Sequence, residues 1–330
     1  LWVKKMEQIF KTLTQLIKNN DDILIMTHKN PDFDGMGSAI GLQQIIHSFK
    51  KNSYIVLNSN EKNKSLDESY DLLKENDLYF NPILKTKANS VIKEDTLLII
   101  LDTHKAEMTE LPELINKSKN VVIIDHHIKS KDYIKDATLT YINANLSSTV
   151  EFVTKYFKYL NKTVDPIIAT FMLVGLEIDT NNFRLKTTKD TYEAASFLSQ
   201  IGADNVLKQE LLQENKDDYI RRQKLIEKSY MVNESMALCV ADNQIYESKD
   251  LAYIAEQLLQ FENVAASFVI GHISKDTIGI SARSLGNINV EEIMAKLGGG
   301  GHLTEAATQI KNSTLKKVEK QLIEQIGGTK

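Results

Sequence analysis

Residues 120–127 read NVVIIDHH, in which a wholly apolar run ends in one aspartate and two histidines. Two further runs of the same character are DILIM at 22–26 and TLLIIL at 96–101. Short runs without polar alternation are typical of strands that are buried on both faces of a parallel sheet. Between the runs, apolar residues recur at helical spacing over 3–19 and 36–50. This alternation predicts an α/β fold, with a parallel sheet and flanking helices.

Acidic and histidine residues follow each apolar run, at the point where a strand would end. They are His28, Asp32 and Asp34 after the first run, Asp102 after the second, Asp125, His126 and His127 after the third, and Asp179 after the apolar residues 167–178. One aspartate after a strand is most often a turn or capping residue. The loops at the carboxyl ends of parallel strands converge on one crevice, however, so a group of this size predicts a metal site.

The donors of this predicted site are imidazole and carboxylate groups. The single cysteine, Cys239, rules out a cysteine-based zinc site. Mn²⁺, Mg²⁺ and Zn²⁺ all accept such donors, and the excess of carboxylates favours Mn²⁺. Because there are more donors than one small ion needs, we expect two divalent ions. Gly35 and Gly37 are expected to let the loop that carries Asp34 turn tightly into the following helix.

The length of 330 residues exceeds what one compact core usually holds, and the sequence pattern changes after about residue 186. We expect a catalytic domain over 1–187, a charged helical connector over 188–230 and a smaller α/β domain over 231–330. The last of these contains GGGGH at 298–302. Four successive glycines indicate close backbone approach or a nest of N–H groups for an anion, with a flexible hinge as the alternative. The net charge of -4 gives no general attraction for long nucleic acid.

The order of these motifs resembles that of the DHH/DHHA1 phosphoesterase family. The segments that carry the resemblance are HKNPDFD at 28–34, LDTHK at 101–105, IDHH at 124–127, SSTVEFV at 147–153, DTNNFRLKT at 179–187 and GISARSLGNINVEEIMAKLGGGGHLTEAATQI at 279–310. Within the family, they look like the catalytic region of the cyclic-di-AMP phosphodiesterases. The resemblance covers essentially the whole chain. It implies a parallel-sheet DHH domain and a smaller α/β DHHA1 domain, with the active site in the cleft between them.

The resemblance also implies two metal ions that share one carboxylate, that of Asp102. The first ion would be held by this residue with His28 and Asp32, and the second by this residue with Asp34, His126 and Asp179. Asp125 and His127 would complete the catalytic group, behind the ligands or against the phosphate. A carboxylate in the place of Asp125 could orient a ligand histidine.

Substrate contacts are expected mainly from the second domain. The candidates are Arg283, Gly299, Gly300, Gly301 and His302, together with Ser148 of the first domain. Arg283 would bind a phosphate or a base edge, with a surface salt bridge as the alternative. Ser148 and Glu151 match a capping box, and the start of the same helix could also bind the phosphate. His104 either contacts the phosphate or lies on the surface.

The expected reaction is hydrolysis of cyclic-di-AMP to linear pApA by a hydroxide that two metal ions activate. The alternative enzyme is a nanoRNase or a 3′-phosphoadenosine 5′-phosphate phosphatase. A cyclic-dinucleotide sensor without turnover is disfavoured, because every expected metal ligand is present. The resemblance further implies a homodimer, a cytoplasmic location and a role in nucleotide signalling. Any membrane anchor is expected in a segment outside this chain, in keeping with Leu1 as its first residue.

Overall fold

The computed structural model describes residues 2–57 and 64–327, which form parts of two compact units, Leu1–Gln213 and Glu214–Lys330. The first unit contains a six-stranded sheet with the order β3-β2-β1-β4-β5-β6, and every pairing in it is parallel. Its strands are β1 (Asp22–Met26), β2 (Asn52–Leu57), β3 (Pro82–Leu84), β4 (Leu97–Leu101), β5 (Asn120–Asp125) and β6 (Leu139–Ile142). The expected parallel sheet is therefore confirmed.

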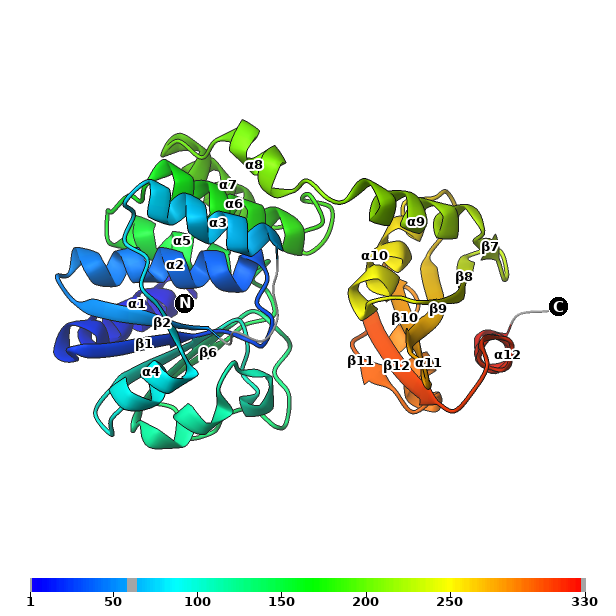
Figure 1. Cartoon of the computed structure of the whole chain (residues 1–330), viewed down its shortest axis with the longest axis horizontal. Helices are drawn as coiled ribbons and strands as arrows, with labels where there is room; N and C mark the ends of the chain where they lie inside the picture. The colour runs from blue at the N-terminus through cyan, green and yellow to red at the C-terminus, as the bar shows by residue number, and fades with distance from the viewer. Residues whose placement is uncertain (1, 58–63, 328–330) are drawn as a thin grey trace. The chain divides into compact units, whose positions relative to one another are not determined.

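Helices cover both faces of this sheet (Figure 1). One face packs against α1 (Trp2–Asn19), α2 (Phe33–Ser48), α3 (Lys64–Glu75), α5 (Thr149–Tyr159), α6 (Pro166–Asp179) and α7 (Lys189–Gln200). The other packs against α4 (Lys85–Val91) and the 3₁₀ turn η2 (Pro112–Lys117), while η1 (Ala106–Met108) and α8 (Asn205–Leu211) complete the unit. Neighbouring residues of each strand enter opposite cores: Ile23 and Ile25 face the first group, and Leu24 and Met26 the second. This two-sided burial explains the apolar runs of β1, β4 and β5.

The strand order reverses between β1 and β4. The chain continues from β1 to β2 and β3 on one side, and from β4 to β5 and β6 on the other. In an open α/β sheet, the crevice that binds ligands lies beyond the carboxyl ends of the strands at such a reversal. His28 follows β1 and Asp102 follows β4, so both residues are placed at this position.

Helix α2 begins at Phe33, three residues earlier than expected. Gly35 and Gly37 therefore lie inside the helix, and the expectation that they bend a loop is wrong. A Cβ at Gly37 would lie 3.2 Å from a backbone oxygen of α6, and a Cβ at Gly175 of α6 would lie 2.5 Å from the backbone oxygen of Phe33. The glycines thus permit close packing of α2 against α6, which positions the first turn of α2.

The second unit contains a sheet with the order β11-β12-β10-β9-β8-β7, in which only the β8–β9 pair is parallel. Its elements are α9 (Lys216–Glu227), β7 (Tyr230–Met231), β8 (Met236–Ile245), α10 (Ser248–Leu258), β9 (Ala266–Ser274), β10 (Thr277–Ser284), α11 (Val290–Lys296), β11 (Gly300–Gly301), β12 (Glu305–Lys311) and α12 (Leu315–Ile326). The expected α/β character of the second domain is confirmed.

The helical segment 188–230, expected as a connector, is divided between the two units, whose boundary lies after Gln213. Ala194 and Leu198 of α7 are buried in the core of the first unit. Leu225 and Ile226 of α9 are buried in a core of the second unit. Both ends of the segment therefore pack as parts of a domain.

The glycine segment of the second unit is part of the sheet. Gly300 and Gly301 form the edge strand β11, which pairs with Ala307 and Ala306 of β12. A Cβ at Gly301 would lie only 2.4 Å from the Cα of Ala306, and one at Gly299 would lie 2.2 Å from the carbonyl oxygen of Ala307. The hinge alternative is therefore wrong, because the glycines serve close backbone approach.

Candidate metal centre

The histidines and carboxylates predicted as metal ligands lie together beyond the carboxyl ends of β1, β4 and β5. A first group consists of His28, Asp32 and Asp102. The Nε2 atom of His28 lies 3.4 Å from Oδ2 of Asp102 and 3.8 Å from Oδ1 of Asp32. One nitrogen or oxygen from each of the three residues lies within 4.8 Å of the others, so the group could hold a metal ion.

A second group brings together Asp34, His126 and Asp179. The Nε2 atom of His126 lies 3.1 Å from Oδ2 of Asp179, 3.9 Å from Oδ2 of Asp34 and 3.2 Å from Oδ1 of Asp102. Asp102 therefore directs one carboxylate oxygen to His28 and the other to His126. This is the geometry that a carboxylate shared by two ions requires.

Asp34 owes its position to the start of α5. Its two carboxylate oxygens accept hydrogen bonds from the backbone N–H groups of Thr149, at 2.7 Å, and Val150, at 2.8 Å. The first turn of a helix has unpaired N–H groups and favours an anion. Ser148 caps this helix, because its hydroxyl accepts a hydrogen bond from the N–H of Glu151. The capping role is confirmed, and the N–H groups at the start of this helix contact the carboxyl group of Asp34.

Asp102 is held by contacts on both sides. The hydroxyl of Thr149 donates to its Oδ1 atom at 3.1 Å, and its backbone N–H donates to the carbonyl of Ile124 at the end of β5. Its φ of 61° lies in the left-handed region, which few residues other than glycine adopt. Thr149 was not predicted, since a threonine after a capping serine carries no sequence signal for such a contact.

Burial and mutual repulsion decide the protonation of the carboxylates. Burial, followed by the charges of Asp179 and Asp102, raises the pKa of Asp34 well above its usual value. Burial also raises the pKa of Asp179 to about 6. Burial opposes ionisation of Asp102 as well, but hydrogen bonds from His126 and His28 outweigh it and lower the pKa of this residue.

The pKa values of the two ligand histidines are raised as well, although burial alone would lower them. Burial lowers the pKa of His28, yet its contacts with Asp102 and Asp32 prevail and raise it to about 11. The pKa of His126 is likewise raised, because Asp102 and Asp179 outweigh its burial. The cluster thus retains protons to balance crowded carboxylates. A divalent cation could replace those protons, so the donor set fits a metal site.

Asp125 contacts two histidines, neither of which is an expected metal ligand. Its Oδ2 atom lies 2.5 Å from Nδ1 of His104, and its Oδ1 atom lies 2.7 Å from Nδ1 of His127. Nδ1 of His28 lies 2.8 Å from the carbonyl oxygen of Lys29, and within the described part of the chain Nδ1 of His126 has no hydrogen-bond partner. The expectation that Asp125 orients a ligand histidine is therefore wrong. His104 is only 3% exposed, which contradicts the surface alternative for this residue.

The candidates in the second unit are placed at one end of its sheet. Arg283 lies on β10 opposite Glu305 of β12, whose strand also pairs with the glycine segment. Its Nε atom forms an ion pair of 3.2 Å with Glu256, and its Nη1 atom donates to the carbonyl of Ala282. Arg283 therefore forms the salt bridge that was considered as the alternative to substrate binding. The backbone N–H of His302 donates to the carbonyl of Glu305 at 2.6 Å, which closes the turn after β11.

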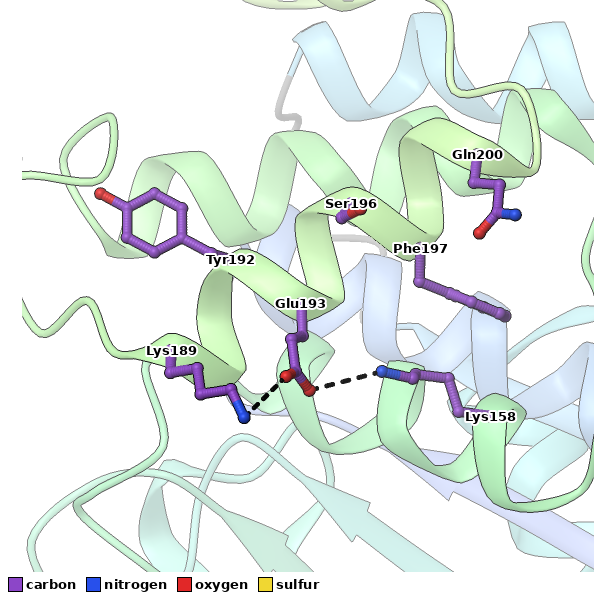
Figure 2. Close-up of a pocket in the computed structure, with 7 residues that line it drawn as sticks. All are labelled: Lys158, Lys189, Tyr192, Glu193, Ser196, Phe197 and Gln200. Atoms are coloured by element: carbon purple, nitrogen blue, oxygen red, sulfur yellow. Dashed lines mark ion pairs between the residues drawn. The ribbon is translucent and has the colours of Figure 1, made fainter.

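A pocket of about 570 Å³ lies elsewhere in the first unit, on α5 and α7 (Figure 2). None of the predicted site residues lines it. The two lysines at its wall, Lys158 and Lys189, both pair with Glu193, so their charges are balanced locally. The chemistry-bearing residues thus lie outside this pocket.

Comparison with protein families agrees with the geometry. The sequence matches the DHH family, N-terminal domain, over residues 22–176, which includes five of the six candidate ligands. It also matches the DHHA1 domain over residues 233–328. The chain has a DHH domain and a DHHA1 domain. Asp179, at the end of α6, lies just beyond the matched part of the DHH domain.

Two relatives are each 39% identical to the chain and are covered by it over 49% of their length. They are the cyclic-di-AMP phosphodiesterases GdpP of Geobacillus thermodenitrificans, aligned over 322 residues, and PdeA of Listeria monocytogenes, aligned over 325 residues; each alignment covers 96% of this chain. The chain thus spans about half the length of these relatives. Among the described residues, we find no helix with the length and apolar character of a bilayer span.

A solved structure with the same fold is that of an exopolyphosphatase-related protein from Bacteroides fragilis. It superposes with a TM-score of 0.79 over 96% of each chain, at 21% sequence identity. At this identity, the likeness supports the arrangement of elements and says nothing of the substrate. The DHH and DHHA1 domains thus have a known architecture, with candidate metal ligands at the strand-order reversal of the first.

Proposed function

We propose that the chain hydrolyses cyclic-di-AMP to linear pApA in a reaction that depends on two divalent metal ions. The observation that carries this proposal is the position of Asp102, whose two oxygens face two separate histidine–carboxylate groups. Two ions held in this way are suited to displacement at phosphorus. The substrate is proposed because two relatives of 39% identity bear the name cyclic-di-AMP phosphodiesterase.

The ligand assignment follows the two groups. His28 and Asp32 would hold one ion, and the second group described above would hold the other, with Asp102 common to both. When bound, the ions would activate water and neutralise charge on the phosphate. The imidazole next to them that is not an expected ligand is that of His127, whose side chain is 50% exposed and therefore accessible to a substrate. We propose Mn²⁺ as the native ion, because carboxylates outnumber imidazoles among the donors.

The nucleotide would be bound by the DHHA1 domain. Arg283 offers a guanidinium, His302 an imidazole and the exposed glycines of β11 their backbone, all at one end of the sheet. Each is a suitable partner for a phosphate or a base. With a net charge of -4, the protein needs such local groups and the metal ions to attract an anionic substrate. A homodimer in the cytoplasm is part of the same proposal.

A product assay tests the reaction. Purified chain is incubated with cyclic-di-AMP, cyclic-di-GMP, pApA and 3′-phosphoadenosine 5′-phosphate, each with Mn²⁺, with Mg²⁺ or with chelator. We expect pApA from cyclic-di-AMP with Mn²⁺, and no product with chelator. Asp102→Ala should reduce the rate by about 10²–10³-fold, because both metal positions lose a ligand. His47→Ala is the matched control, since this exposed residue of α2 stacks on Tyr79.

Three outcomes would contradict the proposal. Faster turnover of pApA or of 3′-phosphoadenosine 5′-phosphate than of cyclic-di-AMP would favour the nanoRNase or phosphatase alternative. Tight binding of cyclic-di-AMP without product in excess Mn²⁺ would favour a sensor. Full activity of Asp102→Ala would exclude the metal centre as the catalytic site. Light scattering on the same sample tests the proposed dimer.

A further inference from the structure

A chain of hydrogen bonds runs through the DHH domain behind the candidate metal ligands. It joins Ser130, His104, Asp125 and His127. His104 and Asp125 are buried, with exposures of 3% and 0%, while His127 is the exposed end of the chain. None of the six candidate metal ligands takes part in these bonds. Buried polar networks that are fully paired hold their members in one arrangement.

The donor at Ser130 determines the tautomer of His104. The backbone N–H of Ser130 donates to Nε2 of His104 at 2.9 Å, so this nitrogen is an acceptor and carries no proton. The proton of the neutral ring is then on Nδ1, which donates to Oδ2 of Asp125 at 2.5 Å. His104 therefore acts as a donor of defined direction towards Asp125, in the tautomer that its neighbours determine.

The other oxygen of Asp125 acts on His127. Oδ1 accepts both the backbone N–H of His127, at 3.0 Å, and its ring Nδ1, at 2.7 Å. A carboxylate oxygen accepts hydrogen bonds, so Nδ1 of His127 carries a proton and is not available as a metal ligand. In the neutral ring, Nε2 is then the nitrogen without a proton. Asp102, His126 and His127 also form a group that could hold an ion, but the proton on Nδ1 argues against His127 as a ligand through that atom.

We propose that His104 is a positioning residue, which holds Asp125 so that this carboxylate fixes the Nδ1–H tautomer of His127 and presents Nε2 to the substrate phosphate. The inference deepens the proposed function and rests on it for the identity of the substrate. It assigns a purpose to a buried histidine two residues after Asp102 in LDTHK. The same logic applies wherever a buried acid orients a catalytic imidazole.

A purely structural role for His104 is the competing explanation. Its backbone carbonyl accepts a hydrogen bond from Ile134, and Lys105 pairs with Tyr133, so this loop has backbone anchors of its own. A structural role predicts loss of stability without a specific change at His127. The positioning role predicts a lower kcat at similar KM, together with a change of the His127 tautomer.

The test compares His104→Leu, which removes the donor, with His104→Asn, whose amide can donate from about the position of Nδ1. Steady-state kinetics on cyclic-di-AMP give kcat and KM. Long-range ¹H–¹⁵N spectra of the Mg²⁺-loaded protein give the His127 tautomer. We expect a kcat that is about 10–100-fold lower for His104→Leu, with KM little changed. His104→Asn should retain more activity and the Nδ1–H tautomer. His47→Leu, about 20 Å along α2 from Asp34, is the control.

The proposal is overturned if wild-type His127 is found as the Nε2–H tautomer. It is also overturned if folded His104→Leu keeps the wild-type kcat, or loses activity with the His127 tautomer unchanged. The spectra need no substrate. An inactive wild-type protein with the expected tautomer would therefore contradict the proposed reaction but not the role of His104. If His104→Leu does not fold, His104→Asn still allows the test.

Discussion

The two candidate metal groups share Asp102 but differ sharply in their surroundings. In the first, the side chains of His28 and Asp32 are 19% and 49% exposed. In the second, those of His126 and Asp34 are 5% and 0% exposed, and Asp34 is held by two backbone N–H groups of α5. An exposed position can exchange its ion and ligands with solvent, whereas a buried one is fixed by the fold. We infer that the buried group holds its ion rigidly and that the exposed group is accessible to solvent and ligands.

The largest expected effect is the loss of stability and activity on Asp34→Asn. It is compared with the same change at Asp32, two residues earlier in the sequence. Asp34→Asn places an amide N–H₂ where one of two backbone N–H groups needs an acceptor, so the protein should lose about 1–3 kcal/mol of stability. It should also lose about 10²-fold or more in activity, as the buried ion position weakens. The free energy of unfolding and the kcat, both measured with excess Mn²⁺, check this.

Asp32→Asn is the matched change at the exposed position. Asp32 accepts hydrogen bonds from the N–H groups of Asp34 and Gly35 as the cap of α2, and asparagine caps a helix about as well as aspartate. Stability should therefore stay within about 0.5 kcal/mol, while metal content and activity fall. Equal losses of stability in the two variants would contradict the difference between the two groups.

These positions also show what the sequence could predict. β1, β4 and β5 were predictable because strands buried on both faces must be apolar, and the ligands were predictable because they follow those strands. The start of α2 was missed because Gly35 and Gly37 argue against a helix, although Asp32 is a good cap. His104 could not be placed, since its burial depends on the later loop that supplies Ser130.

The next prediction concerns how the stability of the metal-free protein depends on pH through Asp179 of the buried group. The pKa of Asp179 is raised from 3.8 to about 6, so between these values the folded protein binds a proton that the unfolded chain does not. The stability of the metal-free protein should therefore fall as pH rises from 4 to 6, by about 1–3 kcal/mol. Stabilisation by added Mn²⁺ should grow over the same range, because the ion replaces that proton.

Chelator-treated protein unfolded at pH 4.5 and 6.5 provides the measurement. Asp179→Asn has no carboxyl to ionise, so the fall in its stability between these pH values should be smaller. Asp32→Asn should keep most of the wild-type pH dependence, because burial, the main cause of the raised pKa of Asp179, is retained and only the smaller contribution of the Asp32 charge is lost. A pH dependence that survives in Asp179→Asn and disappears in Asp32→Asn would reverse the assignment of the buried and the exposed group.

The smallest expected effect tests how closely α2 approaches the exposed group. A Cβ at Gly35 would lie 3.4 Å from Oδ2 of Asp102 and 3.4 Å from Nε2 of His28, which is ordinary contact. Alanine is favoured over glycine inside a helix, so Gly35→Ala should raise the stability by about 0.5–1 kcal/mol. Thermal unfolding measures the gain, and metal content shows whether the ligands have moved.

Gly175→Ala is the substitution to compare with Gly35→Ala. The same methyl group on α6 would lie 2.5 Å from the backbone oxygen of Phe33, in the first turn of α2 that carries Asp34. Overpacking of this kind costs about 1–3 kcal/mol, and here it would displace the buried group. If Gly35→Ala is as harmful as Gly175→Ala, the exposed group has as little freedom as the buried one, and access must be explained in another way.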